Sequence, residues 1–165
     1  MAQNQPPSGT EKQSLSEHVK RRAAFIRDKY ELGSPAKIRK ELLDVMLSDR
    51  EVARFPTELF FTSQIEEGLF GICRKKSEDP RDGYQILLHS SLKDMGNKLA
   101  MFVFYLLVQV NYGDFASCQE AELFAASILD VQVDDYYREL CHLVDTVIQS
   151  DHLKHSSCTC KDGGA

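Results

Sequence analysis

Apolar residues recur every three or four positions over much of the chain, a spacing typical of amphipathic helices. A first helix is expected from Ser14, a candidate N-cap, to about Leu32. Ser34 and Pro35 predict the N-cap and first turn of a second helix that ends near residue 47. Residues 57–67 are expected to form a third helix.

A different pattern follows, in which two short apolar runs flank a segment rich in turn residues. The runs are GLFGICRK, residues 68–75, and YQILLHS, residues 84–90, and the segment between them contains SEDPRDG. Turn residues between two apolar runs indicate a β-hairpin with a long loop. The sequence therefore predicts one hairpin at about residues 68–90.

The segment 92–110 contains the longest apolar run, from Leu99 to Val110. Its aromatic and β-branched residues at 102–105 also suit a strand, but its length favours a helix. A helix that is apolar on all sides must be covered on all sides, so we expect the most buried element here. The run is shorter than the roughly 18 residues of a membrane span. Two more helices are expected, one capped by Asp114 or Ser117 and ending at Leu129, and one over 133–148.

These elements predict a mainly α protein of the α+β class, a compact bundle of five to six helices with one inserted β-hairpin. The 165 residues correspond to a single domain. We expect residues 1–12 to be disordered, residues 13–153 to form the globular domain, and residues 154–165 to be a flexible tail. The polar ends lack the apolar periodicity that would offset the entropy of ordering them.

Charge gives the main functional hint, because the segment 109–151 carries nine acidic residues and one basic residue, Arg138. Such a surface repels nucleic acid and suits a basic protein partner. Aromatic residues, which are enriched at interface cores, lie among the acids. The residues expected to bind the partner are Tyr112, Asp114, Phe115, Asp134, Asp135, Tyr136 and Tyr137. The expected function is that of a non-enzymatic accessory or adaptor domain.

The tail supports an alternative, since two imidazoles and two thiols lie within nine residues. These side chains are His152, His155, Cys158 and Cys160. They are ligand types suited to Zn, Ni, Cu or Fe, so a metal-handling or redox protein remains open, although no cofactor is predicted. Structural zinc sites usually combine ligands from two separate elements, whereas these four form one continuous strip.

A second alternative is a winged-helix-like nucleic-acid-binding domain, because two helices followed by a basic hairpin have the order helix–helix–wing. The segment that would be its recognition helix, TELFFTSQIEE, contains three acidic residues and no basic residue, which argues against it. The absence of familiar catalytic motifs makes an enzyme the less expected class. Five cysteines and an N-terminus without an apolar signal region predict a reducing, cytoplasmic compartment and no membrane partner.

Overall fold

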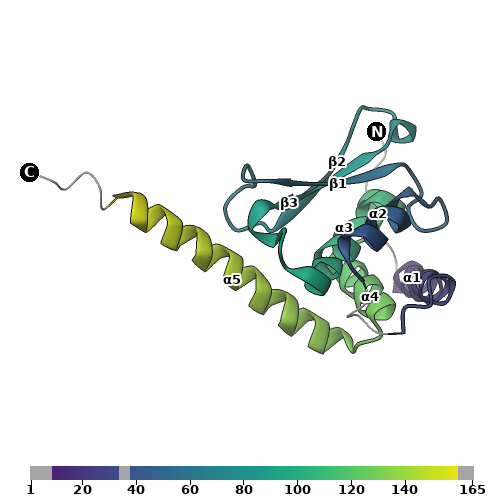
Figure 1. Ribbon diagram of the computed structural model, residues 1–165. Coiled ribbons are helices and arrows are strands. Elements are labelled where there is room, and N and C mark those ends of the chain that lie inside the picture. The colour runs from purple at the N-terminus through teal and green to yellow at the C-terminus, as the bar shows by residue number, and fades with distance from the viewer. Residues whose placement is uncertain (1–8, 34–37, 160–165) are drawn as a thin grey trace, which may run out of the picture.

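The computed structural model describes residues 9–33 and 38–159, with side chains described as far as Val147. This part of the chain contains five α-helices and a three-stranded sheet, joined by loops and short 3-10 turns (Figure 1). The elements are α1 (Gly9–Lys29), α2 (Lys40–Ser48), β1 (Thr57–Thr62), β2 (Gly71–Lys75), β3 (Tyr84–His89), α3 (Leu99–Tyr112), α4 (Cys118–Leu129) and α5 (Val133–Thr159). A mainly helical protein with a small β part is therefore confirmed.

The sheet lies over α3 and has the strand order β1-β3-β2 (Figure 1). β3 pairs in parallel with β1, where Ile86 lies opposite Leu59, and antiparallel with β2, where Ile86 lies opposite Cys73. The two runs that flank SEDPRDG are thus antiparallel neighbours, but they belong to a three-stranded sheet and not to an isolated hairpin. Five of the six β3 residues are buried, as expected for a central strand, whereas β2 is an edge strand.

Strand β1 occupies residues that we expected to begin a third helix, so that expectation is wrong. Thr57 and Leu59 are buried while Glu58 and Phe60 are exposed, which is the two-residue alternation of a strand. The segment is rich in β-branched and aromatic residues, and pairing with a strand much later in the chain decides its conformation. The recognition helix required by the winged-helix interpretation is therefore absent from residues 57–67.

Helix α3 forms the centre of the molecule, and the helix expected over 92–110 is confirmed from Leu99 onward. Residues 92–98, which we expected to belong to it, form short 3-10 segments and turns instead. Ten of its 14 residues are buried, more than in any other described element. The sheet, α2, α4 and α5 all contact it. At its C-terminal end, the Asn111 side chain accepts a hydrogen bond from the backbone N–H of Arg54 and donates one to the carbonyl of Val52. The last turn of α3 is thereby joined to the loop before β1.

Several helix ends differ from their expected positions. α1 begins at Gly9 instead of Ser14, because the intervening residues include good helix formers and nothing interrupts the helix at Ser14. α2 begins at Lys40, and the expected cap at Ser34 and Pro35 lies outside the described residues. Ser117 caps α4 with a complete capping box, as one of the two expected candidates.

At the C-terminal end, α5 continues past residue 148 as far as Thr159 (Figure 1). The backbone of residues 154–159, which we expected to belong to a flexible tail, is therefore helical. The run 148–159 contains no proline or glycine that would interrupt a helix already started by the periodic segment before it.

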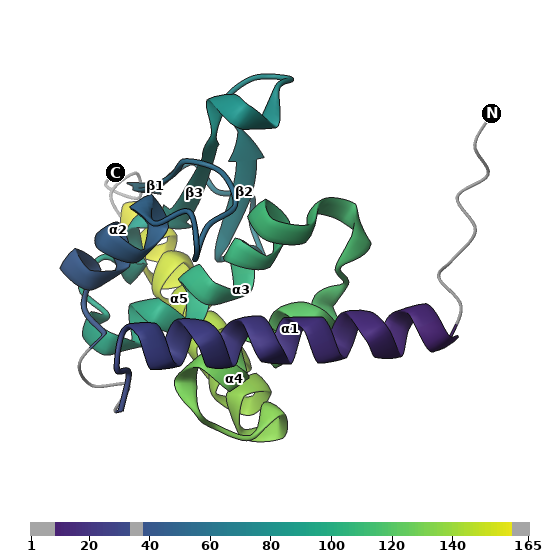
Figure 2. The ribbon, with the colours of Figure 1, turned by 90° about the vertical axis from the view of Figure 1, so that its right-hand side faces the viewer.

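Helix α1 packs along α4 and runs across one side of the molecule (Figure 2). Its C-terminal end is held by a polar cluster around Asp49, just after α2. The Asp49 carboxylate accepts hydrogen bonds from the Tyr30 hydroxyl at 2.6 Å and the Glu51 backbone N–H at 2.9 Å, and pairs with Lys29 at 2.7 Å. Lys29 also pairs with the Glu51 carboxylate. These donors, with Lys29 first, lower the pKa of Asp49 to about 2.

Within the described part of the chain, no helix combines the length and the apolar composition that crossing a lipid bilayer requires.

Replacing the buried Phe104 of α3 tests the role of this helix. Phe104 has no exposed surface, so Phe104→Ala removes buried apolar area and leaves a cavity. We expect the free energy of unfolding to fall by about 3–5 kcal/mol in urea denaturation. The matched control is Phe25→Ala on α1, where the ring is 42% exposed and the expected loss is below about 1 kcal/mol. Equal losses at the two positions would contradict the central placement of α3.

Asp49→Asn tests the polar cluster through its pH dependence. The folded-state pKa of Asp49, about 2, lies below its ordinary value of 3.8. The ionised form therefore stabilises the fold above pH 4, and this contribution is lost as the pH falls from about 4 to about 2. We expect Asp49→Asn to lower the free energy of unfolding by about 1–2 kcal/mol at pH 7 and by progressively less below pH 4.

Urea denaturation of both proteins across this pH range is the measurement. Asp44→Asn is the control, because Asp44 belongs to an exposed i,i+4 pair with Lys40 that contributes less than about 0.5 kcal/mol. A difference between Asp49→Asn and the parent that stays constant down to pH 2.5 would show that the carboxylate charge is not what matters.

Candidate functional site

The nine acidic residues of segment 109–151 have different surroundings in the fold and do not form one uniform face. The buried Glu120 belongs to the α4 capping box, where its carboxylate accepts a hydrogen bond from the Ser117 backbone N–H at 2.7 Å. Three others form ion pairs, Asp130 with Arg27, Asp135 with Arg138 and Glu139 with Lys98. The side chain of Asp151 is outside the described part. No ion pair joins the remaining four within the described residues: Asp114, Glu122, Asp134 and Asp145.

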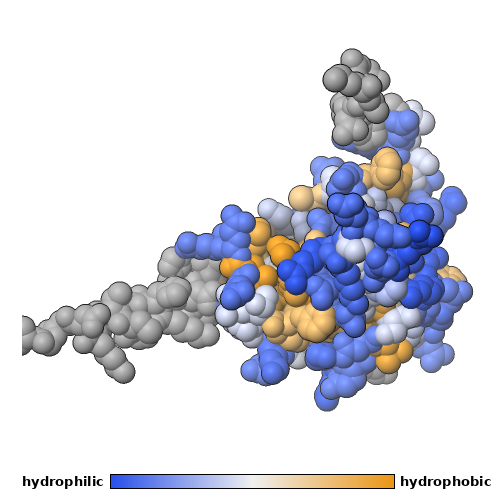
Figure 3. Space-filling view, turned by 90° about the horizontal axis from the view of Figure 1, so that it is seen from above, coloured by the Kyte–Doolittle hydropathy of each residue, from blue (hydrophilic) through white to orange (hydrophobic). Residues whose placement is uncertain are grey.

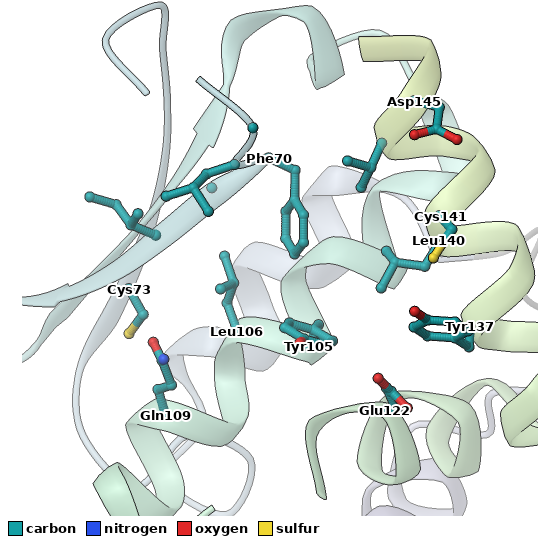
Figure 4. A pocket seen from close by; sticks show the side chains of 15 residues that line it. Phe70, Cys73, Tyr105, Leu106, Gln109, Glu122, Tyr137, Leu140, Cys141 and Asp145 are labelled. Carbon is teal, nitrogen blue, oxygen red and sulfur yellow. The ribbon is translucent and has the colours of Figure 1, made fainter. Parts of the chain in front are cut away.

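Two of these four acids line an open pocket of about 540 Å³ between β2 and α5, here called the β2–α5 groove (Figure 4). Residues 68–73, from the start of β2 and the loop before it, form one wall. α5 forms the opposite wall, where Tyr137, Leu140 and Asp145 point toward the space, and Glu122 enters from α4 (Figure 4). The groove thus brings residues 68–73 together with the three consecutive helices α3, α4 and α5, which lie much later in the sequence.

The floor of the groove is apolar and tightly packed on α3. The ring of Phe70 lies 5.0 Å from that of Phe102 and 5.6 Å from that of Tyr105, measured between centroids. Gly71 leaves room for β3 and α3, because a Cβ there would lie 2.6 Å from the Leu87 carbonyl oxygen of β3 and 3.2 Å from the Leu106 side chain of α3. Side chains at the floor are therefore fixed by packing, and the open space lies above them.

The polar groups of the groove are acidic or neutral, since no Lys, Arg or His is among its lining residues. Partial burial raises the pKa of Glu122, because burial disfavours the charged form of a carboxyl group. A hydrogen bond with the Cys141 thiol raises the pKa of Tyr137, while burial and a hydrogen bond with a thiol raise that of Tyr105. Both tyrosines are consequently neutral hydrogen-bonding groups near pH 7. A cation is the ligand charge that this set favours.

The thiol of Cys73 lies at the β2 wall of the groove, near Gln109 (Figure 4). Burial alone raises its pKa to about 12. Because the thiolate is the reactive form of cysteine, Cys73 provides no activated nucleophile at neutral pH.

Two of the residues expected to bind a partner are engaged within the fold. Tyr136 is 1% exposed, and its hydroxyl donates a hydrogen bond to the Met101 carbonyl at 2.7 Å. Tyr112 is partly buried, and its ring meets that of His18 on α1 edge to face at 5.6 Å between centroids. Tyr136 is therefore a core residue, and Tyr112 connects α3 to α1.

The other expected residues are exposed but lie at opposite ends of α4. Asp114 and Phe115 precede this helix, and the ring of Phe115 is 86% exposed. Asp134 and Asp135 occupy the first turn of α5, after the C-terminal end of α4. A helix of 12 residues is roughly 18 Å long, so the two groups do not form one cluster. Tyr137 alone of the expected set lines the groove, with its side chain 52% exposed.

The proposed metal ligands of the tail stay untested. His152, His155 and Cys158 lie on α5 in the part whose side chains are not described, and Cys160 lies outside the described residues. Among the side chains that are described, no group of three or more His, Cys, Asp or Glu has an arrangement that could hold a metal ion.

The β2 wall and the polar residues that α3 contributes to the groove were missed by sequence reasoning, although the sequence carries a signal for the α3 residues. Tyr105 and Gln109 are four residues apart and interrupt an otherwise apolar helix. Residues at this spacing lie on one side of a helix, so they mark the side of α3 that is incompletely covered. No comparable pattern in the sequence shows that residues 68–73 line the groove, because this depends on the position of β2 at the sheet edge.

Alkylation rates test the description of the β2 wall. With iodoacetamide at pH 8, we expect Cys73 to react at least about tenfold more slowly than the exposed Cys118 in the native protein. Peptide mass spectrometry gives both rates, and guanidinium-unfolded protein is the control in which the two become similar. Similar rates in the native protein would mean that the Cys73 thiol is not enclosed between β2 and α3.

No protein-family model, curated protein or solved structure matches this chain. The function is therefore inferred from the geometry and the charges of the β2–α5 groove.

Proposed function

We propose that this chain is a non-enzymatic accessory domain that binds a basic protein partner through the acidic, tyrosine-bearing side around the β2–α5 groove. The observation that carries the proposal is the distribution of charge. The fold neutralises several acids of segment 109–151 internally, and two of the four that it leaves without an ion pair line the groove. A basic side chain would supply the charge that the groove lacks.

The apolar part of the groove supports a protein or peptide partner over a simple ion. Leu106, Leu140 and Val144 line the space together with the half-exposed ring of Tyr137. Tyrosine is enriched at interface hot spots because it combines a large apolar ring with a hydrogen-bonding hydroxyl. Burying these surfaces would provide affinity, and Glu122 and Asp145 would select for a cationic side chain.

Asp134 contributes at longer range in this proposal. It is exposed in the first turn of α5 and has no ion pair among the described side chains. Such a charge steers an oppositely charged partner during encounter, and salt screens it over a Debye length of about 8 Å at physiological ionic strength. Asp114 and the exposed Phe115 would extend the contact surface at the other end of α4. The same acidic charges disfavour nucleic acid, whose phosphates they repel.

A photo-crosslinking residue at position 137 tests the proposed function. We expect Tyr137→p-benzoylphenylalanine to form a discrete crosslinked product in host cells, because the Tyr137 ring would face the bound partner. Val45→p-benzoylphenylalanine is the matched control, since Val45 is 57% exposed but lies on α2. Mass spectrometry of the product identifies the partner and the residue attached.

Charge dependence provides the second half of this test. In the crosslinking protein, Asp134→Lys together with Asp135→Lys should reduce the yield at least about threefold at low salt and much less in 0.5 M NaCl, where charges are screened. Circular dichroism checks that the variants are folded. Identical products from positions 137 and 45, or none from position 137, would exclude this side of the molecule as the partner surface.

A further inference from the structure

The free edge of β2 borders the groove and has unused backbone hydrogen-bonding groups. The β2–β3 ladder is bounded by two hydrogen bonds, from His89 N–H to the Phe70 carbonyl and from Lys76 N–H to the Gly83 carbonyl, each 2.9 Å long. Because pairing alternates along an antiparallel ladder, the backbone groups of Gly71, Cys73 and Lys75 point to the opposite edge. Nothing in the described part of the chain pairs with that edge.

The edge is unprotected only where it borders the groove. Natural edge strands are usually shielded by charged side chains, proline or a bulge. Here the charges, Arg74 and Lys75, occupy the end of β2 away from the groove, and residues 68–73 contain no charged residue and no proline. The part of β2 that lines the groove is therefore the part that can pair with another strand.

The groove provides the space that an added strand needs. A paired strand lies about 4.8 Å from its neighbour, and its residues opposite Gly71 and Cys73 place their side chains on the same face as these two residues. That face is the groove side, because a Cβ at Gly71 would contact Leu106 of α3 at 3.2 Å. The 540 Å³ of open space lies between this edge and α5 (Figure 4). An added strand would thus direct alternate side chains into the groove.

The outer face of the sheet supplies contacts for the other side chains of such a strand. Phe60, Leu87 and Ile72 lie side by side across the three strands, and Phe60 is 42% exposed. Apolar residues gather on part of the upper side of the molecule (Figure 3). Ile72 is the member of this row on the edge strand, so an apolar residue placed opposite it would extend the row by one position.

From these features we infer that the β2–α5 groove binds an extended segment of a basic protein, which adds to β2 as a fourth strand in the order β1-β3-β2-segment. The inference rests on the proposed function and specifies how the partner binds. Side chains facing the groove include Lys or Arg residues that meet Glu122 at one end of the groove and Asp145 at the other. The side chain opposite Ile72 is apolar, and the one opposite Arg74 is acidic or neutral.

The experiment uses the full chain labelled with 15N and a synthetic peptide, acetyl-Thr-Arg-Val-Arg-Val-Arg-Thr-amide, whose basic and apolar residues alternate. At saturation, we expect amide hydrogen exchange at Gly71 and Cys73 to slow at least about fivefold. The amides of Ile72 and Arg74, which already belong to the β3 side of the ladder, should change less. Fluorescence anisotropy of a labelled peptide gives the affinity.

Two N-methylated peptides separate strand addition from binding by side chains alone. One carries N-methyl groups on the Arg residues and the other on the Val residues. Only alternate N–H groups of an added strand face β2, so one methylated form should lose at least about tenfold in affinity and the other should bind nearly as the parent. Equal binding of the two forms would overturn strand addition.

Charge recognition is tested with Glu122→Gln, which we expect to weaken binding of the Arg peptide about three- to tenfold. Glu41→Gln is the matched control, an exposed acid of α2 outside the groove, and should stay within twofold. The same peptide with Glu in place of Arg should not bind. An equal effect of both variants would overturn the assignment of the basic side chain to the groove.

The failure of this inference is distinguishable from that of the proposed function. A crosslinked partner at position 137 without slowed exchange at Gly71 and Cys73 would support the partner surface but overturn the added strand. If exchange at Gly71 and Cys73 becomes slower as the protein concentration is raised without peptide, the edge pairs with a second copy of the chain. That result would overturn a partner's segment as its occupant. Absence of any crosslink at position 137 would count against the proposed function itself.

Discussion

Helix α3 determines the architecture, because none of its sides is polar enough to face water over its full length. Its buried residues need neighbours in every direction, and the chain provides them from the sheet, α2, α4 and α5. The sheet is placed by this need as well, since β3 packs an almost continuous apolar run between its two neighbouring strands and α3. The two ends of α3 are then attached by polar contacts, Lys98 with Glu139 on α5 and Asn111 with the backbone before β1.

The candidate site is the place where this covering is incomplete. Tyr105 and Gln109 interrupt the apolar surface of α3, and above them β2 and α5 diverge and leave an open groove. β2 is the edge strand, so the same opening exposes a row of backbone donors and acceptors. An incompletely covered helix and an unpaired strand edge therefore meet at one position, and a single extended segment would satisfy both.

The distribution of charge also distinguishes the groove from the rest of the acidic segment 109–151. α1 carries six of the 20 Lys and Arg residues of the chain and packs against α4, and its Arg27 pairs with Asp130 just after α4. The basic N-terminal helix therefore compensates part of the acidic segment within the molecule. The acids Glu122 and Asp145 have no ion pair among the described side chains, and both line the groove to which we assign partner binding.

The amino-acid sequence by itself determined the features that depend on neighbouring residues. These include the helical periodicity of α1, α4 and α5, the length of the apolar run that forms α3, Ser117 as one of two candidate caps of α4, and the two strands that flank SEDPRDG. The conformation of TELFFT was decided by tertiary structure, because so short a segment suits a strand or a helix until a distant strand pairs with it. Tyr136 and Tyr137 are a second case in which the local sequence leaves the outcome open, this time at the candidate site. Adjacent residues of a helix point about 100° apart, and only the packing of α5 on α3 and α4 decides that Tyr136 enters the core while Tyr137 lines the groove.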